Sequence, residues 1–330
     1  MRITREILLN HAKENVAKLT ARYRYIVCIY LTGSLLREDP FIGGVTDIDL
    51  ICVHGHPVTR RREVIRLSPE ISLDLAHYGQ EEFEPPRKLR SEPWMGGDME
   101  TVPQVLYDGL RWYDYTRAAA TAQFWRAEHI AARASGLLAP ARKTWSDLID
   151  DSIPQGLKRV SAFLDAVQGV SNAVICLTGT PLPIRRLMLD LPEKAAQAEL
   201  PDFYGELIQL FTSEAVTDEN LETWLASYAA MFEELKEAKE PPTSLQPFRR
   251  AYYEKAIRAV YPSHPAAAIW ILLRSWTQAA SHLAKSGQGY KDWQSFCKQL
   301  DLDTARLPAR IEVLDHLLDT VEESVDHLGA

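Results

Sequence analysis

Two aspartates separated by one residue, Asp47 and Asp49, are the clearest candidates for chemistry in this chain of 330 residues. Asp49 stands inside the apolar run 48–53, which predicts a β-strand, and residues two apart in a strand project to the same side. A third aspartate, Asp74, stands between two leucines in a second run of this kind. Because charged side chains are rarely held in apolar strands without compensation, the three acids predict a cation site.

The residue types around these acids indicate which cation and which partner. Carboxylate oxygens suit Mg²⁺, which binds through one or two carboxylates together with substrate phosphates. Gly33 permits a close backbone approach or a positive φ, and Ser34 offers a hydroxyl and an amide at a helix N-terminus to an anion. Together these parts predict metal-assisted transfer of a nucleotidyl group, with pyrophosphate leaving.

The elements that must position these residues follow from the hydrophobic patterns. Apolar residues three to five apart predict a first helix that ends near Arg22, and β-branched runs predict three core strands. Pro103 restricts a further strand to the edge of the sheet. The strands are expected at 25–31, 48–53, 71–76 and 102–107, with a short helix around 60–62 and irregular chain over 85–97.

After about residue 111 the pattern becomes helical, and prolines and a glycine turn at 287–289 divide it. Helices are expected near 141–151, 153–178, 203–212, 217–238, 247–260, 264–286 and 306–327. The chain is therefore predicted to be α+β, with a small mixed β-sheet domain over 1–120 followed by an all-α helical bundle over 121–330.

Gly33-Ser34, a short spacer and Asp47-x-Asp49 with apolar neighbours resemble the motif of the DNA polymerase β type nucleotidyltransferase superfamily, and Asp74 matches its third acid. The resemblance covers about 45 residues. It implies that Asp47 and Asp49 bridge two Mg²⁺ ions, for which Mn²⁺ can substitute, and that Asp74 holds the ion nearest the acceptor hydroxyl. It also implies that Gly33 and Ser34 contact the β and γ phosphates.

In domain order and size the chain is similar to the aminoglycoside nucleotidyltransferases. Pro181 to Leu187, after a long predicted helix, is similar to a turn in the substrate domain of such proteins. This second resemblance implies transfer from a nucleoside triphosphate, with ATP as the first choice, to a hydroxyl of a small molecule such as an aminoglycoside. It leaves both a monomer and a homodimer open.

Enzymes of this kind often add a carboxylate that removes the acceptor proton, and the motif does not identify it here. Asp98 and Glu100 are the two candidates, because they follow the third strand in a glycine-bearing segment expected to be a loop beside the cleft.

Two further groups of residues near the second strand are weaker candidates. Arg60, Arg61 and Arg62 could contact a triphosphate, although a run of charges usually marks a solvated helix face. The pair His54 and His56 lacks an acid or cysteine at ligand spacing and is interpreted as part of a loop.

Composition narrows the classes of partner. The net charge of −8 argues against a duplex nucleic-acid binder, and the excess of acid lies after residue 130, where 20 basic side chains stand against 27 acidic ones. The acidic second half of the chain could attract a polycation.

Cysteine content and hydrophobicity bear on the expected location of the protein. The four cysteines form no CxxC pair, and neither a leader nor an uninterrupted apolar run of about eighteen residues occurs. We therefore expect a cytoplasmic protein without a membrane span.

Two other functions remain open at this point: nucleotidyl transfer to RNA or to a protein side chain, as in toxin-like relatives, and nucleotide binding without catalysis. The enzymatic interpretation depends on the convergence of Asp47, Asp49 and Asp74. It would collapse if Asp74 lay on the far side of the sheet or packed its carboxylate against a structural arginine.

Overall fold

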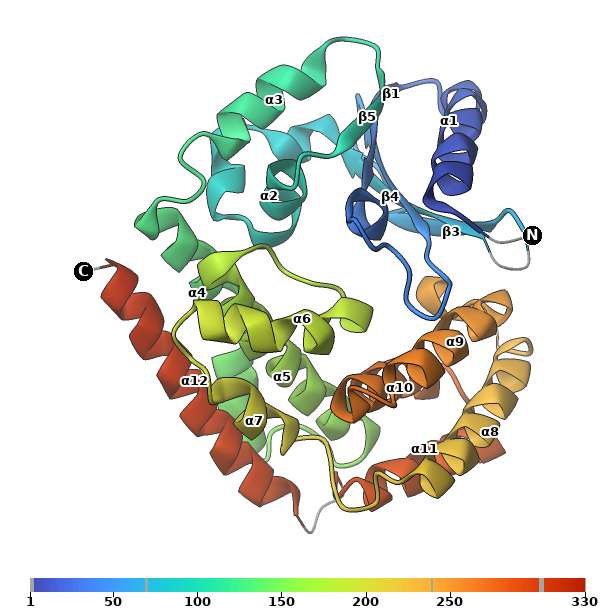
Figure 1. Cartoon of the computed structure of the whole chain (residues 1–330), viewed down its shortest axis with the longest axis vertical. Coiled ribbons are helices and arrows are strands. Elements are labelled where there is room, and N and C mark those ends of the chain that lie inside the picture. Colours follow the sequence, from blue (N-terminus) through green and yellow to red (C-terminus); the bar gives the residue numbers. More distant parts are fainter. Residues whose placement is uncertain (1–2, 69–70, 239, 303–305, 330) are drawn as a thin grey trace. The chain divides into compact units, whose positions relative to one another are not determined.

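The computed structural model describes residues 3–68, 71–238, 240–302 and 306–329. The chain divides into two compact units, Met1–His129 (unit 1) and Ile130–Ala330 (unit 2) (Figure 1). Unit 1 contains a five-stranded mixed sheet with helices, and the described residues of unit 2 contain helices and no strand. The predicted α+β class is therefore confirmed.

The sheet of unit 1 has the order β3-β4-β2-β1-β5. Only the pair β2 and β4 is parallel, whereas the other neighbours are antiparallel. The three predicted core strands and the predicted edge strand are all present. The strands are β1 (Ile26–Thr32), β2 (Ile48–His54), β3 (Arg62–Arg66), β4 (Ser72–Gly79) and β5 (Gln104–Asp108).

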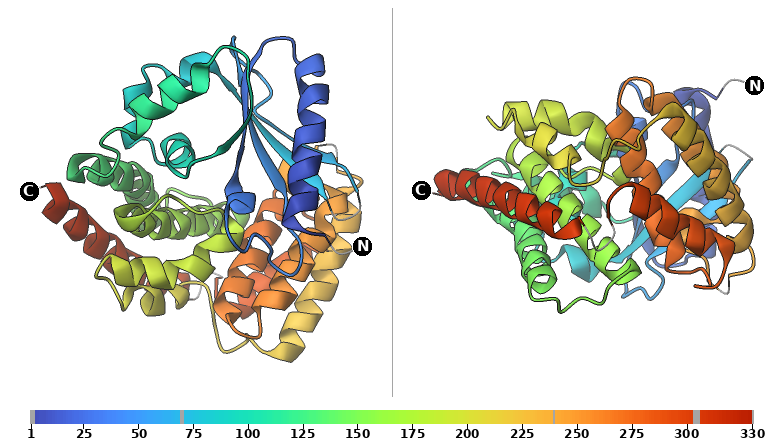
Figure 2. Two further views of the ribbon diagram at one scale, coloured as in Figure 1. Left: turned by 45° about the horizontal axis from the view of Figure 1, so that its top comes forward. Right: turned by 90° about the horizontal axis from the view of Figure 1, so that it is seen from below.

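Helices cover both faces of this sheet (Figures 1 and 2). On one face lies α1 (Arg5–Arg22), which begins after Thr4, whose hydroxyl accepts the amide N–H of Ile7 as an N-cap. The other face packs under α2 (Pro93–Glu100) and α3 (Trp112–Thr121). Alternate residues of the strands supply two separate apolar cores, one for each face.

Two local predictions in unit 1 are wrong. The segment expected as a short helix around Arg60 to Arg62 leads into β3, where Glu63 and Ile65 face α1 and Val64 faces the other side. Pairing with β4 satisfies this two-residue alternation, which a helix would not. The stretch expected to be irregular contains α2, because Glu92 caps the amides of the first turn and Pro93 occupies the first helical position.

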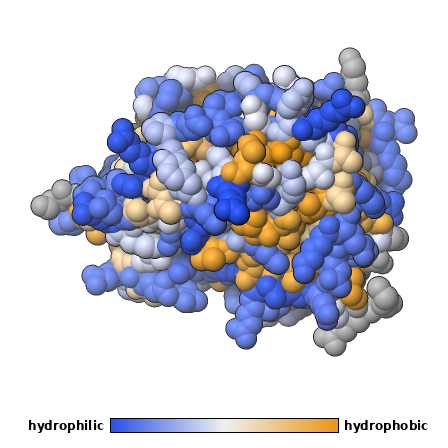
Figure 3. All heavy atoms as spheres, turned by 90° about the horizontal axis from the view of Figure 1, so that it is seen from above, coloured by the Kyte–Doolittle hydropathy of each residue, from blue (hydrophilic) through white to orange (hydrophobic). Residues whose placement is uncertain are grey.

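The free edge of the sheet at β5 is apolar. Val102, Val105 and Leu110 lie on or beside this strand and are exposed. Figure 3 shows, without distinguishing individual residues, that the displayed face of the molecule includes a hydrophobic area. Free edges of sheets usually carry charges that prevent pairing with other chains. In β5 the only charged side chain is Asp108, which instead accepts the amide N–H groups of Trp112 and Tyr113 at the start of α3.

Unit 2 contains nine α-helices in its described residues, counting α4, which begins just before the unit boundary. They are α4 (Ala127–Ile149), α5 (Leu157–Thr178), α6 (Ile184–Gln197), α7 (Phe203–Ile208), α8 (Asp218–Leu235), α9 (Arg250–Val260), α10 (Pro265–Ala280), α11 (Gln288–Gln299) and α12 (Leu307–Gly329). The predicted segments are recovered with shifted ends, α4 beginning well before residue 141.

Two helices of unit 2 were not predicted. Prolines at 181, 183 and 192 suggested a break, yet α6 begins after Pro183 and continues through Pro192. Its apolar stripe explains this continuation, because Leu187, Met188 and Leu191 are buried and packing outweighs the local cost of the proline. The second is α11, which begins at Gln288, inside the predicted glycine turn, and buries Trp293 and Phe296.

The helix α5 is long and apolar enough to cross a membrane by length and composition alone. Most of it is nevertheless buried among the other helices of unit 2, including Phe163, Leu164 and Val170. Core helices of folded domains have the same length and composition, and the burial of α5 is that of a core helix of unit 2.

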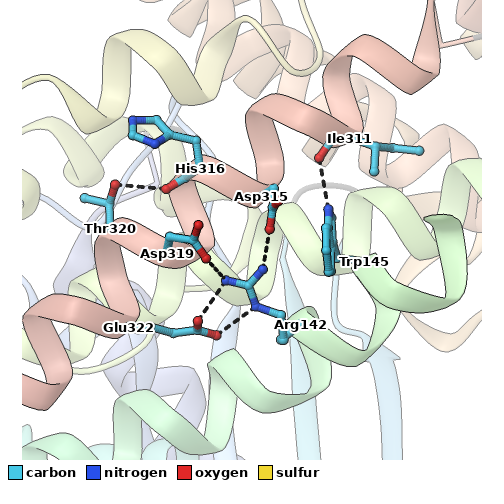
Figure 4. Close-up of polar contacts among 8 residues, drawn as sticks. All are labelled: Arg142, Trp145, Ile311, Asp315, His316, Asp319, Thr320 and Glu322. Carbon is cyan, nitrogen blue, oxygen red and sulfur yellow. Dashed lines mark hydrogen bonds and ion pairs between the residues drawn. The ribbon is translucent and has the colours of Figure 1, made fainter.

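One arginine joins α4 to α12 in unit 2. Arg142 donates to Asp315 and Asp319 at 2.5 Å each and to the two carboxylate oxygens of Glu322 at 3.0 and 2.8 Å (Figure 4). These hydrogen bonds raise the pKa of Arg142. The three acids lie on successive turns of α12, so a single guanidinium holds about two turns of the C-terminal helix against α4.

A buried polar network lies beneath the C-terminal end of α1. The ring nitrogen Nε2 of His54 lies 2.9 Å from Nδ1 of His77, and Nε2 of His77 lies 3.7 Å from the Glu63 carboxylate. Glu63 accepts the hydroxyl of Tyr23 at 2.6 Å. His54 therefore belongs to the core rather than to a loop.

Two arginines lie beside the carboxylate of Glu63. The guanidinium groups of Arg22 and Arg60 lie 3.3 and 3.0 Å from its oxygens.

Burial holds both histidines in the neutral form. It lowers the pKa of His54 to about 4, with a further contribution from the neighbouring rings of His77 and His56. Burial also lowers the pKa of His77, although the Glu63 carboxylate opposes this shift. Between pH 6.5 and 4 the unfolded chain therefore takes up a proton at His54 that the folded chain does not, so this group makes the fold less stable as the pH falls.

We predict that His54→Gln flattens the pH dependence of stability. The glutamine amide can still donate to Nδ1 of His77 but does not titrate, so the free energy of unfolding should fall less between pH 7.5 and 5 than in the unmodified protein. The difference in this fall should be about 2 kcal/mol. Urea unfolding at both pH values measures it, and parallel pH profiles for the two proteins would contradict the prediction.

Candidate functional site

The parallel pairing of β2 with β4 places two of the predicted acids side by side. Asp49 is the direct partner of Asp74 in this register, and neighbouring strands lie about 4.8 Å apart. The residues that flank these acids, Leu50, Leu73 and Leu75, are buried in the core under α1. Both aspartates therefore point to the opposite face, the one that α2 and α3 cover.

The third acid, Asp47, comes from the chain just before β2. A tight turn precedes it, in which Ile42 and Val45 exchange backbone hydrogen bonds across Gly43 and Gly44. Both glycines have positive φ, as such a turn requires. Asp47, Asp49 and Asp74 each bring one carboxylate oxygen to within 4.8 Å of the others, and Asp47 and Asp74 are buried. The predicted convergence of the three acids is present.

The turn at Gly33 and Ser34 lies directly against Asp49. Gly33 has a φ of +74°, and a Cβ at this position would lie 2.3 Å from Oδ2 of Asp49. Only glycine therefore allows the backbone to approach the carboxylate this closely. The Ser34 hydroxyl lies 2.5 Å from that of Thr46 and so joins the turn to the segment that carries Asp47. The helix expected after Gly33 is only a single 3-10 turn, Gly33–Leu36.

The three acids fit a hard divalent cation. All the donors are carboxylate oxygens, the ligand type that Mg²⁺ and Mn²⁺ take in proteins. Oxygens bound to Mg²⁺ at 2.0–2.1 Å are at most about 4.2 Å apart, so small rotations of the side chains would close the observed 4.8 Å spacing. Bringing three carboxylates together without positive charge would be unfavourable, and the cluster therefore calls for cationic compensation.

The structure separates the two candidates for the proton acceptor. Both lie on α2 rather than in the loop expected from the glycines. Asp98 accepts the hydroxyl of Thr32 at 2.8 Å, and Thr32 is the cross-strand partner of Asp49. Glu100 accepts the indole N–H of Trp125 at 2.7 Å instead. Of the two candidates, Asp98 is therefore the one that contacts a residue, Thr32, directly beside Asp49 in the sheet.

The carboxyl group of Asp98 also has an unusual acidity. Burial raises its pKa to about 6, and the nearby charge of Glu92 adds to this rise, while the hydrogen bond from Thr32 opposes it. A carboxyl group with a pKa in this range is ionised at pH 7 and still basic enough to accept a proton.

Arg62, one of the arginines predicted as candidates for contact with a triphosphate, instead forms hydrogen bonds with Asp74 in the structure. Its Nε and a terminal nitrogen donate to the two oxygens of Asp74, each at 2.7 Å. Asp74 thus packs against an arginine, the arrangement that would overturn the enzymatic interpretation if that arginine were structural. However, the Arg62 side chain is 54% exposed at the sheet edge, whereas Asp74 is buried. Arg62 is accordingly no buried structural arginine, and its contact supplies positive charge to the cluster.

Three residues of the site were not assigned from the sequence. Thr32 and Thr46 carry no distinctive motif, and their roles follow from strand register and from the turn that precedes β2. Arg62 was considered only as one of three consecutive arginines. The signal that distinguishes it is the alternation over 62–66, which places it on the same face of the sheet as Asp74.

No protein-family model matches the chain, and no curated protein is found with significant similarity to it. Among solved structures the chain is similar to a nucleotidyltransferase-like protein from Exiguobacterium sibiricum, with 16% sequence identity and a TM-score of 0.30. The match covers 77% of this chain and 91% of that one. At this level of similarity, the interpretation of the site rests on its own geometry.

We predict that Gly33→Ala disrupts the acid cluster. The added Cβ must displace the Asp49 carboxylate, so the affinity for Mn²⁺ should fall at least about tenfold in a calorimetric titration. The positive φ should in addition cost about 1 to 2 kcal/mol of stability.

Gly44→Ala is the matched control for this change. Gly44 also has a positive φ, of +72°, but no atom lies within 4 Å of its added Cβ. This variant should therefore lose similar stability and keep its affinity for Mn²⁺. Equal loss of affinity in the two variants would show that backbone strain, rather than contact with Asp49, determines the effect.

Proposed function

We propose that the protein is a divalent-metal-dependent nucleotidyltransferase that moves a nucleoside monophosphate from a nucleoside triphosphate to an acceptor hydroxyl. The observation that carries this proposal is the convergence of Asp47, Asp49 and Asp74 beside the turn at Gly33 and Ser34. A nucleotide-binding role alone would not require three adjoining carboxylates, two of them buried, at such cost in desolvation.

Each residue of the site has a defined task in this reaction. Asp47, Asp49 and Asp74 would hold the divalent cations, with Asp47 and Asp49 contributing to both. Bound there, the cations would neutralise charge on the triphosphate and stabilise the leaving pyrophosphate. The amide and hydroxyl groups of the turn at Gly33 and Ser34 would donate to the terminal phosphates, which the exposed position of Gly33 permits.

Asp98 is proposed as the general base. The acceptor oxygen attacks the α-phosphorus and forms a new O–P bond, while the bond from this phosphorus to the bridging oxygen breaks and pyrophosphate leaves. The proton of the acceptor hydroxyl passes to Asp98. Its hydrogen bond to Thr32 beside Asp49 and its raised pKa support this role over Glu100, which is bonded to Trp125.

The acceptor is proposed to be a small, positively charged molecule with free hydroxyls, of which aminoglycosides are examples, and the donor to be ATP. The acidic excess after residue 130 supports a cationic acceptor, because such a surface field attracts polycations. A small molecule acceptor also agrees with the overall charge of −8, which does not favour nucleic acid. All four cysteines are buried and none forms a disulfide in the part of the chain that the structure describes, in agreement with a proposed cytoplasmic location.

We predict that α-labelled ATP with Mg²⁺ transfers label to a member of an acceptor panel of aminoglycosides, transfer RNA and the protein itself. Asp49→Asn should reduce transfer at least about 10³-fold, because a cation ligand and its charge are lost. An unchanged circular dichroism spectrum would verify the fold of the variant.

Each outcome of this panel identifies one function. Label on an aminoglycoside supports the proposal in full, and label on RNA or on protein replaces the acceptor. Binding of ATP without turnover under all conditions would instead identify a silent nucleotide-binding module. Undiminished transfer by Asp49→Asn would contradict the role given to the acids.

We predict a second effect, on the pH profile. The rate at saturating substrate should rise with pH around an apparent pKa of about 6, as Asp98 becomes ionised. Asp98→Asn keeps an acceptor for the Thr32 hydroxyl but not the basic group, so it should lower kcat about 10² to 10⁴-fold and abolish this rise. Glu100→Gln serves as the control and should change kcat less than about threefold. A profile that Asp98→Asn leaves unaltered would exclude Asp98 as the base.

A further inference from the structure

The contact between Arg62 and Asp74 joins an exposed cation to a buried acid of the site. Two parallel hydrogen bonds of 2.7 Å connect the planar guanidinium to both oxygens of the carboxylate. This two-pronged geometry is the strongest that an arginine makes with a carboxylate.

The charge of the cluster changes with the position of this arginine. Three carboxylates carry a charge of about −3, and one guanidinium reduces this to about −2, which a single divalent cation balances. With Arg62 withdrawn, one divalent cation leaves a negative charge that attracts a second. The number of cations that the three acids hold therefore depends on whether Arg62 stays on Asp74.

The surroundings of Arg62 allow it to leave. It is the first residue of β3, a five-residue strand at the edge of the sheet, and its side chain is 54% exposed. The neighbouring arginines are held elsewhere, since Arg60 contacts Glu63 and Arg61 contacts Glu82. A guanidinium that leaves Asp74 can donate in the same two-pronged manner to a phosphate, so a triphosphate is a competing partner of matching chemistry.

We propose that Arg62 is an internal counter-cation that competes with the divalent metal for Asp74 and transfers to the triphosphate when the nucleotide binds. In the absence of nucleotide, Asp47 and Asp49 hold one cation while Arg62 occupies Asp74. Nucleotide binding removes Arg62 from the acid and so completes the site for the second cation. The inference rests on the proposed function and adds to it an order of assembly, in which the second cation follows the nucleotide.

The test is the binding of Mn²⁺ alone, followed by electron paramagnetic resonance and calorimetry, with and without the non-reacting analogue α,β-methylene-ATP. The unmodified protein should bind one Mn²⁺ alone and two in the presence of the analogue. Arg62→Ala should bind two Mn²⁺ without the analogue, the first about tenfold more tightly, and should bind the analogue about tenfold more weakly. Arg62→Gln, which keeps hydrogen bonding without the charge, should lie between the two.

Arg61→Ala is the matched control, because Arg61 is a neighbouring exposed arginine that contacts Glu82 and not Asp74. Its Mn²⁺ binding should equal that of the unmodified protein. Unchanged or weaker Mn²⁺ binding in both Arg62 variants would overturn the competition, as would two Mn²⁺ ions on the unmodified protein without nucleotide. If the unmodified protein transfers label and binds Mn²⁺ but the Arg62 variants do not differ from it, only this inference fails. If it neither binds Mn²⁺ nor transfers label, the proposed function fails as well.

Discussion

The repulsion among three neighbouring carboxylates is the constraint on which the interpretation of this protein depends. Asp47, Asp49 and Asp74 bring their oxygens to within 4.8 Å of one another, and two of them are buried. Such an arrangement is stable only with positive charge beside it. In the structure Arg62 provides part of that charge, and a divalent cation is the natural source of the rest. The turn at Gly33, the short strand β3 and the helix α2 are all arranged around this requirement.

The core strands and the convergence of the acids could be predicted from the sequence because both depend on local alternation. The run from Ile48 is apolar and contains β-branched residues, with Asp49 as its one charged position, and Asp74 lies between two leucines that must face a core. Once both segments are strands, the direction of each aspartate is determined. The pairing of Asp49 with Asp74 also needs the parallel register of β2 and β4, which no local pattern encodes.

The parts that were not predicted depend on contacts distant in sequence. The local pattern of the charged segment around Arg62 predicts a short helix. Its pairing with β4, which lies later in the chain, makes it a strand instead. In the same way α6 continues through Pro192 because its buried face outweighs a local penalty. Asp98 was a candidate from its position in the chain, but its bond to Thr32 and its raised pKa arise from the packing of α2 on the sheet.

The alternation of residues along β2 and β4 also gives the acids a part in specifying the fold. Beside the acids, the face of these strands toward α1 is apolar, with Leu50, Leu73 and Leu75 almost fully buried. If either strand slipped by one residue, Asp49 or Asp74 would enter that hydrocarbon layer, at a desolvation cost of several kcal/mol for an ionised carboxylate. This cost disfavours misaligned sheets, so the carboxylates that suit the site to a divalent cation also favour the correct strand register.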